Sequence, residues 1–211
     1  MQTVYDLECY PNFFCAGFSP VDAPDDVGYI FEISDRRNDA AQLFQFITTC
    51  KRMIGFNNMY YDWPMLDHFL QLLSERRHVT AADMYAFNQR IFAMQDNEKH
   101  LGLVIWKPAI EQVDLFMLHH LLRFGGSLKK CQFAMRSQSI QDLPYPPGTW
   151  LTHAEMDVTL RYNAHDVRKT KRMFHMSKPS IDFRATLGSE WLSYNDGKVG
   201  KKYFEQQLIE A

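Results

Sequence analysis

Two carboxylates near the start of the chain are the first residues whose spacing suggests chemistry. Asp6 and Glu8 flank Leu7 in the segment Thr3-Val-Tyr-Asp-Leu-Glu8, which is typical of a β-strand. Side chains alternate between the two faces of a strand, so both carboxylates project from one face. Such neighbouring charges repel unless a cation lies between them, and oxygen ligands favour Mg²⁺ or Mn²⁺. The alternative is an exposed acidic pair on an edge strand.

Two further acids have positions that suit the same chemistry, although each has a simpler explanation by itself. Asp62 follows a short strand and a polar loop and opens a helix, where an acid also stabilises free N–H groups and the helix dipole. Asp166 lies on a long helix one turn after Tyr162, so these two side chains share a helix face. The alternative for Asp166 is a hub of salt bridges among the surrounding bases. On this helix we expect Asn163 and His165 to point elsewhere.

The composition indicates one globular domain of ordinary size. The chain has 211 residues, of which 46% are hydrophobic and 14% aromatic, so a substantial core can form. The formal net charge of −2 excludes a strongly basic protein that coats nucleic acid. The charge is uneven, because residues 1–35 hold seven acids and no Lys or Arg, whereas residues 115–141 hold no acid. We expect bound metal ions to offset the negative charge of the acidic segment, and the bases of the other segment to contact phosphates.

The sequence also predicts a cellular compartment. No apolar run approaches the roughly 18–20 residues that span a bilayer, and the first residues lack the basic and apolar regions of a signal peptide. The four cysteines form no CxxC pair and are expected to be reduced thiols. We expect a cytoplasmic protein without a membrane partner.

Periodicity and turn residues predict the elements that position the acids. Strands are expected over 3–7, 12–18, 28–33, 52–55 and 111–115, and helices over 39–50, 62–74, 81–94, 128–135 and 152–176. A less regular segment follows, with a helix from residue 198. Three strands followed by alternating helices and strands predict an α/β fold with a mixed β-sheet flanked by helices.

The order and spacing of the acids resemble the DEDD superfamily of 3′→5′ exonucleases, also called DnaQ-like, which has a ribonuclease-H-like fold. The matching segments are Asp6-x-Glu8, Asn58-x-x-x-Asp62 and Tyr162-x-x-x-Asp166. Arg161 stands five residues before Asp166, where another subclass has histidine, so the chain resembles the tyrosine subclass, DEDDy. A weaker match joins Val113-Asp114-Leu115 with Ser127-Leu128-Lys129.

A narrower resemblance is to the N-terminal proofreading region of bacteriophage DNA polymerases. It rests on Tyr5-Asp-Leu-Glu-x-Tyr-Pro-Asn-Phe-Phe14, Gly55-Phe-Asn-Asn-x-x-Tyr-Asp62 and Leu143-Pro-Tyr-Pro-Pro-Gly148. The resemblance implies an exonuclease domain over residues 1–176 and a C-terminal extension, or a junction to an absent polymerase domain, over 177–211. It also implies a DNA polymerase domain or subunit as a partner and the host cytoplasm as the location. An excised domain and a free-standing exonuclease are both compatible with the sequence.

The resemblance implies phosphodiester hydrolysis with two divalent metal ions, Mg²⁺ or Mn²⁺. Asp6 would bridge the ions, and Glu8 and Asp166 would complete the site that holds the attacking water. Asp62 would hold the second ion. Tyr162 would orient the water, because an unperturbed tyrosine with a pKa of about 10 stays protonated at neutral pH.

The resemblance and the local sequence also suggest contacts with the substrate. The candidate substrate-binding residues are Leu7, Phe13, Asn58, Tyr61, Trp63 and Lys129. Aromatic side chains stack on bases without regard to sequence, and a lysine contacts phosphate. Core packing and a solvated helix face are the alternatives.

Three functions follow from these observations. The first is a metal-dependent 3′→5′ exonuclease that acts on the 3′ end of single-stranded or frayed DNA and releases nucleoside 5′-monophosphates. The second is an RNA exonuclease of the same fold. The third is a catalytically idle module that binds nucleic acid or a partner protein. The presence of all four carboxylates and the tyrosine favours the first.

Overall fold

The computed structural model describes residues 1–25, 27–75, 78–97, 107–119, 121 and 126–210. Its centre is a five-stranded sheet in the order β3-β2-β1-β4-β5. The strands are β1 (Gln2–Tyr10), β2 (Phe13–Pro20), β3 (Tyr29–Ser34), β4 (Arg52–Gly55) and β5 (Glu111–Asp114). β1, β2 and β3 pair antiparallel, whereas β1, β4 and β5 pair in parallel. The expected α/β class and mixed sheet are confirmed, and the arrangement is consistent with a ribonuclease-H-like fold.

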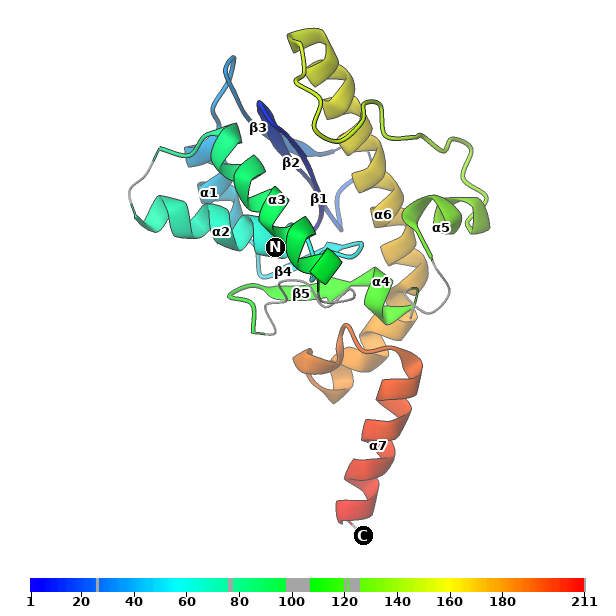
Figure 1. Ribbon diagram of the computed structural model, residues 1–211. Helices are drawn as coiled ribbons and strands as arrows, with labels where there is room; N and C mark the ends of the chain where they lie inside the picture. Colours follow the sequence, from blue (N-terminus) through cyan, green and yellow to red (C-terminus); the bar gives the residue numbers. More distant parts are fainter. Residues whose placement is uncertain (26, 76–77, 98–106, 120, 122–125, 211) are drawn as a thin grey trace.

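Helices flank the sheet (Figure 1). They are α1 (Ala40–Thr48), α2 (Asp62–Ser74), α3 (Ala81–Asn97), α4 (Leu115–Leu118), α5 (Leu128–Ala134), α6 (His153–Leu187) and α7 (Asp196–Glu210), with a short 3-10 helix, η1 (Ser189–Trp191). α6 crosses β1 and β2, and α5 packs beside α6. α2 packs against α3, which in turn contacts β1 and β2.

The alternation of side chains along β1 decides which helices each residue meets. Tyr5 and Leu7 belong to the core cluster formed with α1, α2 and α3. Val4 belongs to the opposite cluster, which includes Val167 of α6. Asp6 and Glu8 have the same parity as Val4, so β1 presents both carboxylates to α6.

α6 begins as the sequence predicts but ends later. The Thr152 side chain and Glu155 form a capping box at its start. The expected end at residue 176 is wrong, because the helix continues through Pro179 to Leu187. A proline inside a helix removes one hydrogen bond and costs about 3 kcal/mol. Ile181, two residues beyond the proline, is buried in the core.

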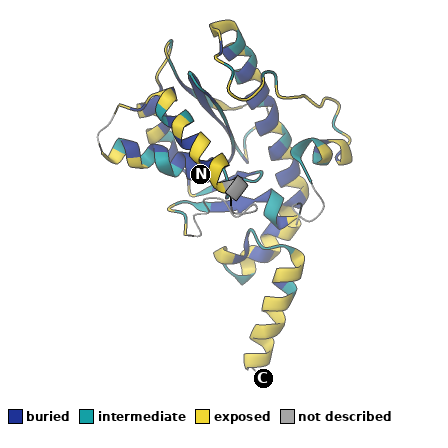
Figure 2. Cartoon of the chain, in the orientation of Figure 1, coloured by how far each residue is buried: buried dark blue, intermediate teal, exposed yellow. Residues whose placement is uncertain are grey.

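The C-terminal segment and the cysteines complete the fold. α7 begins at Asp196, two residues before the expected start, and most of its surface is exposed (Figure 2). All four cysteines are free, in agreement with the expected thiols. Within the described ranges, the structure contains no helix with the length and apolar character needed to cross a membrane.

Candidate active site

Asp6 and Glu8 form the centre of an acidic cluster on the α6 side of β1. Burial raises the pKa of Asp6, and the charges of Glu8, Asp62 and Asp166 raise it further. Burial likewise raises the pKa of Glu8, with added repulsion from Asp166 and Asp62. The fold therefore gathers the four carboxylates that the sequence analysis singled out into one electrostatically coupled group.

The main chain of β1 holds the Asp62 carboxylate, beyond the point where the pairing of β1 with β4 ends. The pairing of β1 with β4 extends only to Val4, opposite Ile54. Beyond that point the N–H of Leu7 donates to Asp62 Oδ1 at 3.1 Å. Burial is the main cause that raises the pKa of Asp62 to about 7, and the charge of Asp114 adds to it. The carboxylate is thereby fixed beside the cluster.

Tyr162 and Asp166 reach the cluster from α6, one helical turn apart. Asp166 Oδ1 lies 3.1 Å from His165 Nδ1 and accepts a 3.4 Å hydrogen bond from Gln132 Nε2 of α5. Burial raises the pKa of Tyr162, and the charges of Asp166 and Glu8 raise it further. Its hydroxyl therefore stays protonated at neutral pH and can donate a hydrogen bond.

The structure corrects the orientation predicted for Asn163. The Asn163 amide donates to the main-chain oxygen and to Oδ2 of Asp6, both at 3.0 Å, so this side chain points into the site. Successive residues of an α-helix are rotated by about 100° about its axis. Tyr162 and Asn163 are successive, so both side chains lie on the half of α6 that meets the sheet. His165 contacts Asp166 and Ser139, so it also belongs to the surroundings of the cluster.

Asp114 is a structural acid that supports Asp62 from the neighbouring strand. Its carboxylate is fully buried and accepts hydrogen bonds from four main-chain N–H groups, those of Asn57, Met59, Phe116 and Met117. It thus caps α4 and pins the loop that leads into α2. Burial is the main cause that raises its pKa to about 6. In the sequence, the feature that marks Asp114 is an acidic residue near the end of an expected strand and directly before a helix.

Four of the predicted substrate-binding residues lie in the interior. Leu7 and Trp63 belong to the core beneath α1 to α3. Phe13 packs in a third cluster with Leu151. Asn58 is fully buried and donates to Tyr5 Oη and Gln112 Oε1. The structure therefore places these four side chains in the interior, where they pack against other parts of the chain.

Tyr61 and Lys129 have more exposed positions. The Tyr61 hydroxyl donates to Asn88 Oδ1 at 2.8 Å, and its ring stacks on Phe92. Asp62 and Glu8 are among the charges that raise the pKa of Tyr61, so it borders the cluster. Lys129 forms an ion pair with Asp142 at 2.5 Å, which compensates its charge.

The donor chemistry of the cluster fits a divalent cation. Burial and the charges of neighbouring carboxylates raise the pKa of both Asp6 and Glu8. A bound cation would relieve this repulsion. In the part of the chain that the structure describes, no three acidic, His or Cys side chains are already arranged to hold an ion.

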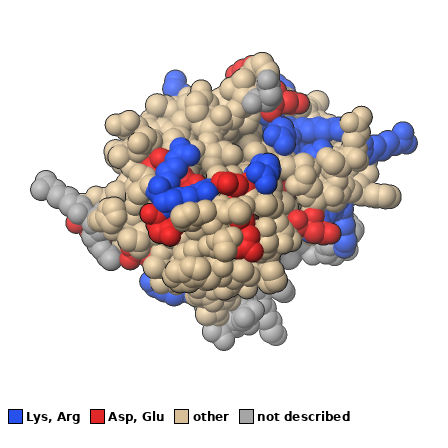
Figure 3. Space-filling model, turned by 90° about the horizontal axis from the view of Figure 1, so that it is seen from above, with Lys and Arg blue, Asp and Glu red and all other residues tan. Residues whose placement is uncertain are grey.

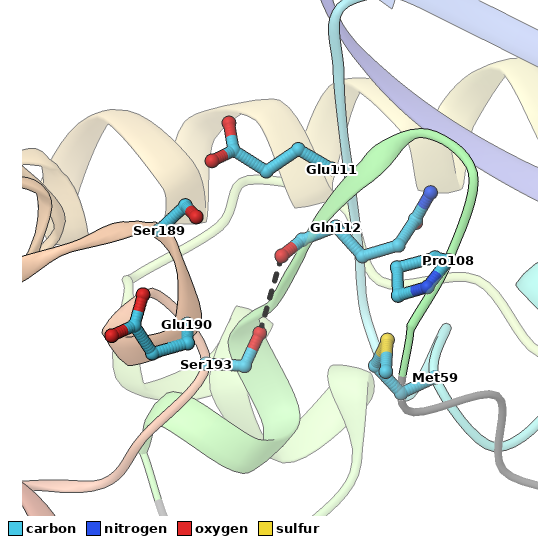
Figure 4. Close-up of a pocket in the computed structure, with 7 residues that line it drawn as sticks. All are labelled: Met59, Pro108, Glu111, Gln112, Ser189, Glu190 and Ser193. Carbon is cyan, nitrogen blue, oxygen red and sulfur yellow. Dashed lines mark hydrogen bonds between the residues drawn. The ribbon is translucent and has the colours of Figure 1, made fainter.

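A separate cavity of about 300 Å³ lies at the edge of the sheet (Figure 4). It is lined by Met59, Pro108, Glu111, Gln112, Ser189, Glu190 and Ser193. Ser193 Oγ accepts from the Asp114 N–H at 3.0 Å and donates to the Gln112 carbonyl at 3.4 Å. The segment after α6 is thereby joined to the edge strand β5, and none of the four clustered carboxylates lines this cavity.

Comparison with solved structures gives a likeness in fold. No family model and no curated protein matches the sequence. The fold is similar to the structure of the family B DNA polymerase from the hyperthermophilic archaeon Pyrobaculum calidifontis, with a TM-score of 0.58 and 16% identity. The match covers 91% of this chain and 26% of the polymerase chain. At this level of identity the likeness establishes a shared fold.

Proposed function

We propose that this protein is a metal-dependent 3′→5′ exonuclease that acts on the 3′ end of single-stranded or frayed DNA and releases nucleoside 5′-monophosphates. The observation that carries the proposal is the coupling of Asp6, Glu8 and Asp166, with Tyr162 beside them. Buried carboxylates that repel one another are costly unless a cation joins them. The likeness to a DNA polymerase supports nucleic acid as the substrate class.

The residues of the cluster have distinct roles in this proposal. Asp6, Glu8, Asp62 and Asp166 would hold two Mg²⁺ or Mn²⁺ ions, which would supply a nucleophilic water and neutralise charge on the scissile phosphate. Asn163 fixes Asp6, and the main chain of Leu7 fixes Asp62. Protonated Tyr162 donates a hydrogen bond that orients the attacking water.

A proofreading role of the bacteriophage polymerase type is the biological setting that we propose. The match covers 26% of the archaeal polymerase chain, which is about a quarter of its length. The partners proposed are therefore the 3′ end of a DNA strand and a DNA polymerase domain or subunit. The C-terminal segment from residue 177 is proposed as the connection to that partner.

The direct test is degradation of 3′-labelled and 5′-labelled single-stranded DNA with Mg²⁺ or Mn²⁺. We expect mononucleotides to leave from the 3′ end and the activity to disappear in Asp6→Ala and Asp166→Ala. Gln207→Ala, on the exposed end of α7, is a suitable control. No degradation by the wild-type protein, or degradation that persists in both acid variants, would contradict the proposal.

A matched RNA strand separates the two nuclease hypotheses. Faster degradation of RNA than of DNA would identify the RNA exonuclease instead. Thermal stabilisation by Mg²⁺ that Asp166→Ala abolishes would argue against an idle module. Absence of both hydrolysis and metal stabilisation would favour a binding module.

A further inference from the structure

Basic side chains continue around α6 from the acidic cluster toward solvent. Lys169 follows Asp166 by three residues, and Arg172 follows Lys169 by three more. Each step rotates the side chain by about 60° and advances it by about 4.5 Å along the helix. Arg168 is exposed on the same turns. These positions form a path from the buried Asp166 to the outer surface of α6.

The turn after α5 adds a fourth base to this path. Arg172 Nη2 donates to the main-chain oxygen of Met135 at 2.9 Å. Arg136 is the next residue and is exposed, with a left-handed φ of 51°. We call Arg136, Arg168, Lys169 and Arg172 the basic band. Two elements distant in sequence are joined here, so the band is a product of the tertiary structure.

The basic band keeps unpaired positive charge within the described part of the chain. None of its four members lies within ion-pair distance of a described carboxylate. Burial lowers the pKa of Lys169, repulsion by Arg172 and Arg168 lowers it further, and the charge of Asp166 raises it. By contrast, Lys178 pairs with Asp182 and Arg184 pairs with Asp196.

We propose that the basic band binds the phosphate backbone of the single strand whose 3′ end enters the acidic cluster. This inference rests on the proposed exonuclease function. A polyanion neutralises uncompensated bases and releases its condensed counterions, so contact with a strand is favourable. The band begins one turn from Asp166, which allows one strand to contact both. Lys and Arg side chains gather on one part of the face seen in Figure 3, and others on that face lie beside acidic groups.

The test compares a band variant, Arg168→Gln/Lys169→Gln/Arg172→Gln, with a matched control on α7, Lys198→Gln/Lys201→Gln/Lys202→Gln. Binding of a labelled DNA strand of about 12 nucleotides is measured by fluorescence anisotropy in EDTA, from about 50 to 200 mM KCl. Hydrolysis of the same strand and of a dinucleotide is measured with Mg²⁺. A dinucleotide is too short to lie along the band.

We expect the band variant to bind the strand about tenfold more weakly than the wild type. The slope of log K against log salt concentration should fall in magnitude by about 2, because each lost phosphate contact to a single strand accounts for about 0.7. The ratio of kcat/KM for the strand to that for the dinucleotide falls about tenfold. The control keeps wild-type values. Equal binding and hydrolysis by the band variant and the wild type, or equal losses in both variants, would overturn the inference. If the wild-type protein hydrolyses neither substrate, the exonuclease proposal fails, while the anisotropy comparison still decides whether the band binds a strand.

Discussion

The side chain of Asn163 on α6 holds Asp6 on β1 by two hydrogen bonds, each 3.0 Å long, to the carboxylate and to the main-chain oxygen. Gly17 is the β2 partner of Asp6 in the sheet. A Cβ atom at Gly17 would lie 2.0 Å from Asn163 Oδ1. The glycine therefore permits the close approach that brings Tyr162 and Asp166 to β1.

Loss of the Asn163 amide should weaken metal binding more than it weakens the fold. We expect Asn163→Ala to lower Mg²⁺ affinity about 10- to 100-fold, because partners that orient ligand carboxylates have effects of this size. Calorimetric titration with Mg²⁺ measures this change. The control is Thr170→Val, since the Thr170 hydroxyl is buried on the same helix without a hydrogen-bond partner among the described residues. Equal metal affinity of Asn163→Ala and the wild type would refute the positioning role.

A methyl group at Gly17 should separate α6 from the sheet. We expect Gly17→Ala to lower the free energy of unfolding by about 1–3 kcal/mol, as overpacking does in cores. Chemical denaturation gives this value. Gly200→Ala is the matched control, because no atom lies within 4 Å of a Cβ at that helical position. We expect the control to be neutral or slightly stabilising. If Gly17→Ala unfolds with the same free energy as the wild type, α6 moves away from the sheet without loss of stability, and the prediction is wrong.

Removal of the Tyr162 hydroxyl should slow hydrolysis and leave metal binding intact. We expect Tyr162→Phe to lower kcat about 100-fold, because the hydroxyl orients the water but is not assigned as a ligand. Single-turnover hydrolysis and Mg²⁺ titration measure the two effects. Tyr194→Phe is a control outside the cluster, where the ring packs against Lys198. A parallel loss of metal affinity in Tyr162→Phe would indicate that the hydroxyl acts through the carboxylates.

In the absence of metal, stability should fall as the pH rises through the range in which the cluster ionises. The pKa of Asp62 rises from 3.8 to about 7 on folding, so the folded protein retains a proton that the unfolded chain has released. The contribution of Asp62 is therefore favourable below about pH 4 and is lost progressively up to about pH 7, with a size on the order of 4 kcal/mol.

Denaturation in EDTA at several pH values checks this sign. We expect Asp62→Asn to be more stable than the wild type above pH 7 and to lose this advantage near pH 4, because the amide still accepts from the Leu7 N–H but carries no charge. Mg²⁺ should stabilise the wild type more than the variant at pH 8. Identical pH profiles of the two proteins would exclude a buried, repelled Asp62.

Local sequence determined much of the fold and the acidic side chains of the site. Strand β4 and helix α2 have the predicted bounds, because turn residues and a proline in the first helical turn mark them. Alternation placed Asp6 and Glu8 on one face, and helical spacing placed Tyr162 one turn before Asp166. These relationships need only the geometry of a single strand or helix, so they are readable without knowledge of the partners.

The tertiary structure decided which of the flanking residues reach the site. Trp63, Asn58 and Asn163 are all fully buried, but Trp63 packs in the core and Asn58 bonds to Tyr5 and Gln112, whereas Asn163 points to Asp6. Burial and close approach depend on pairs such as Gly17 and Asn163, which are far apart in the chain and meet only when helix and sheet pack. The sequence likewise did not show that α6 continues past Pro179, where Ile181 packs into the core. A periodic pattern specifies a face of an element, but only packing specifies what that face contacts.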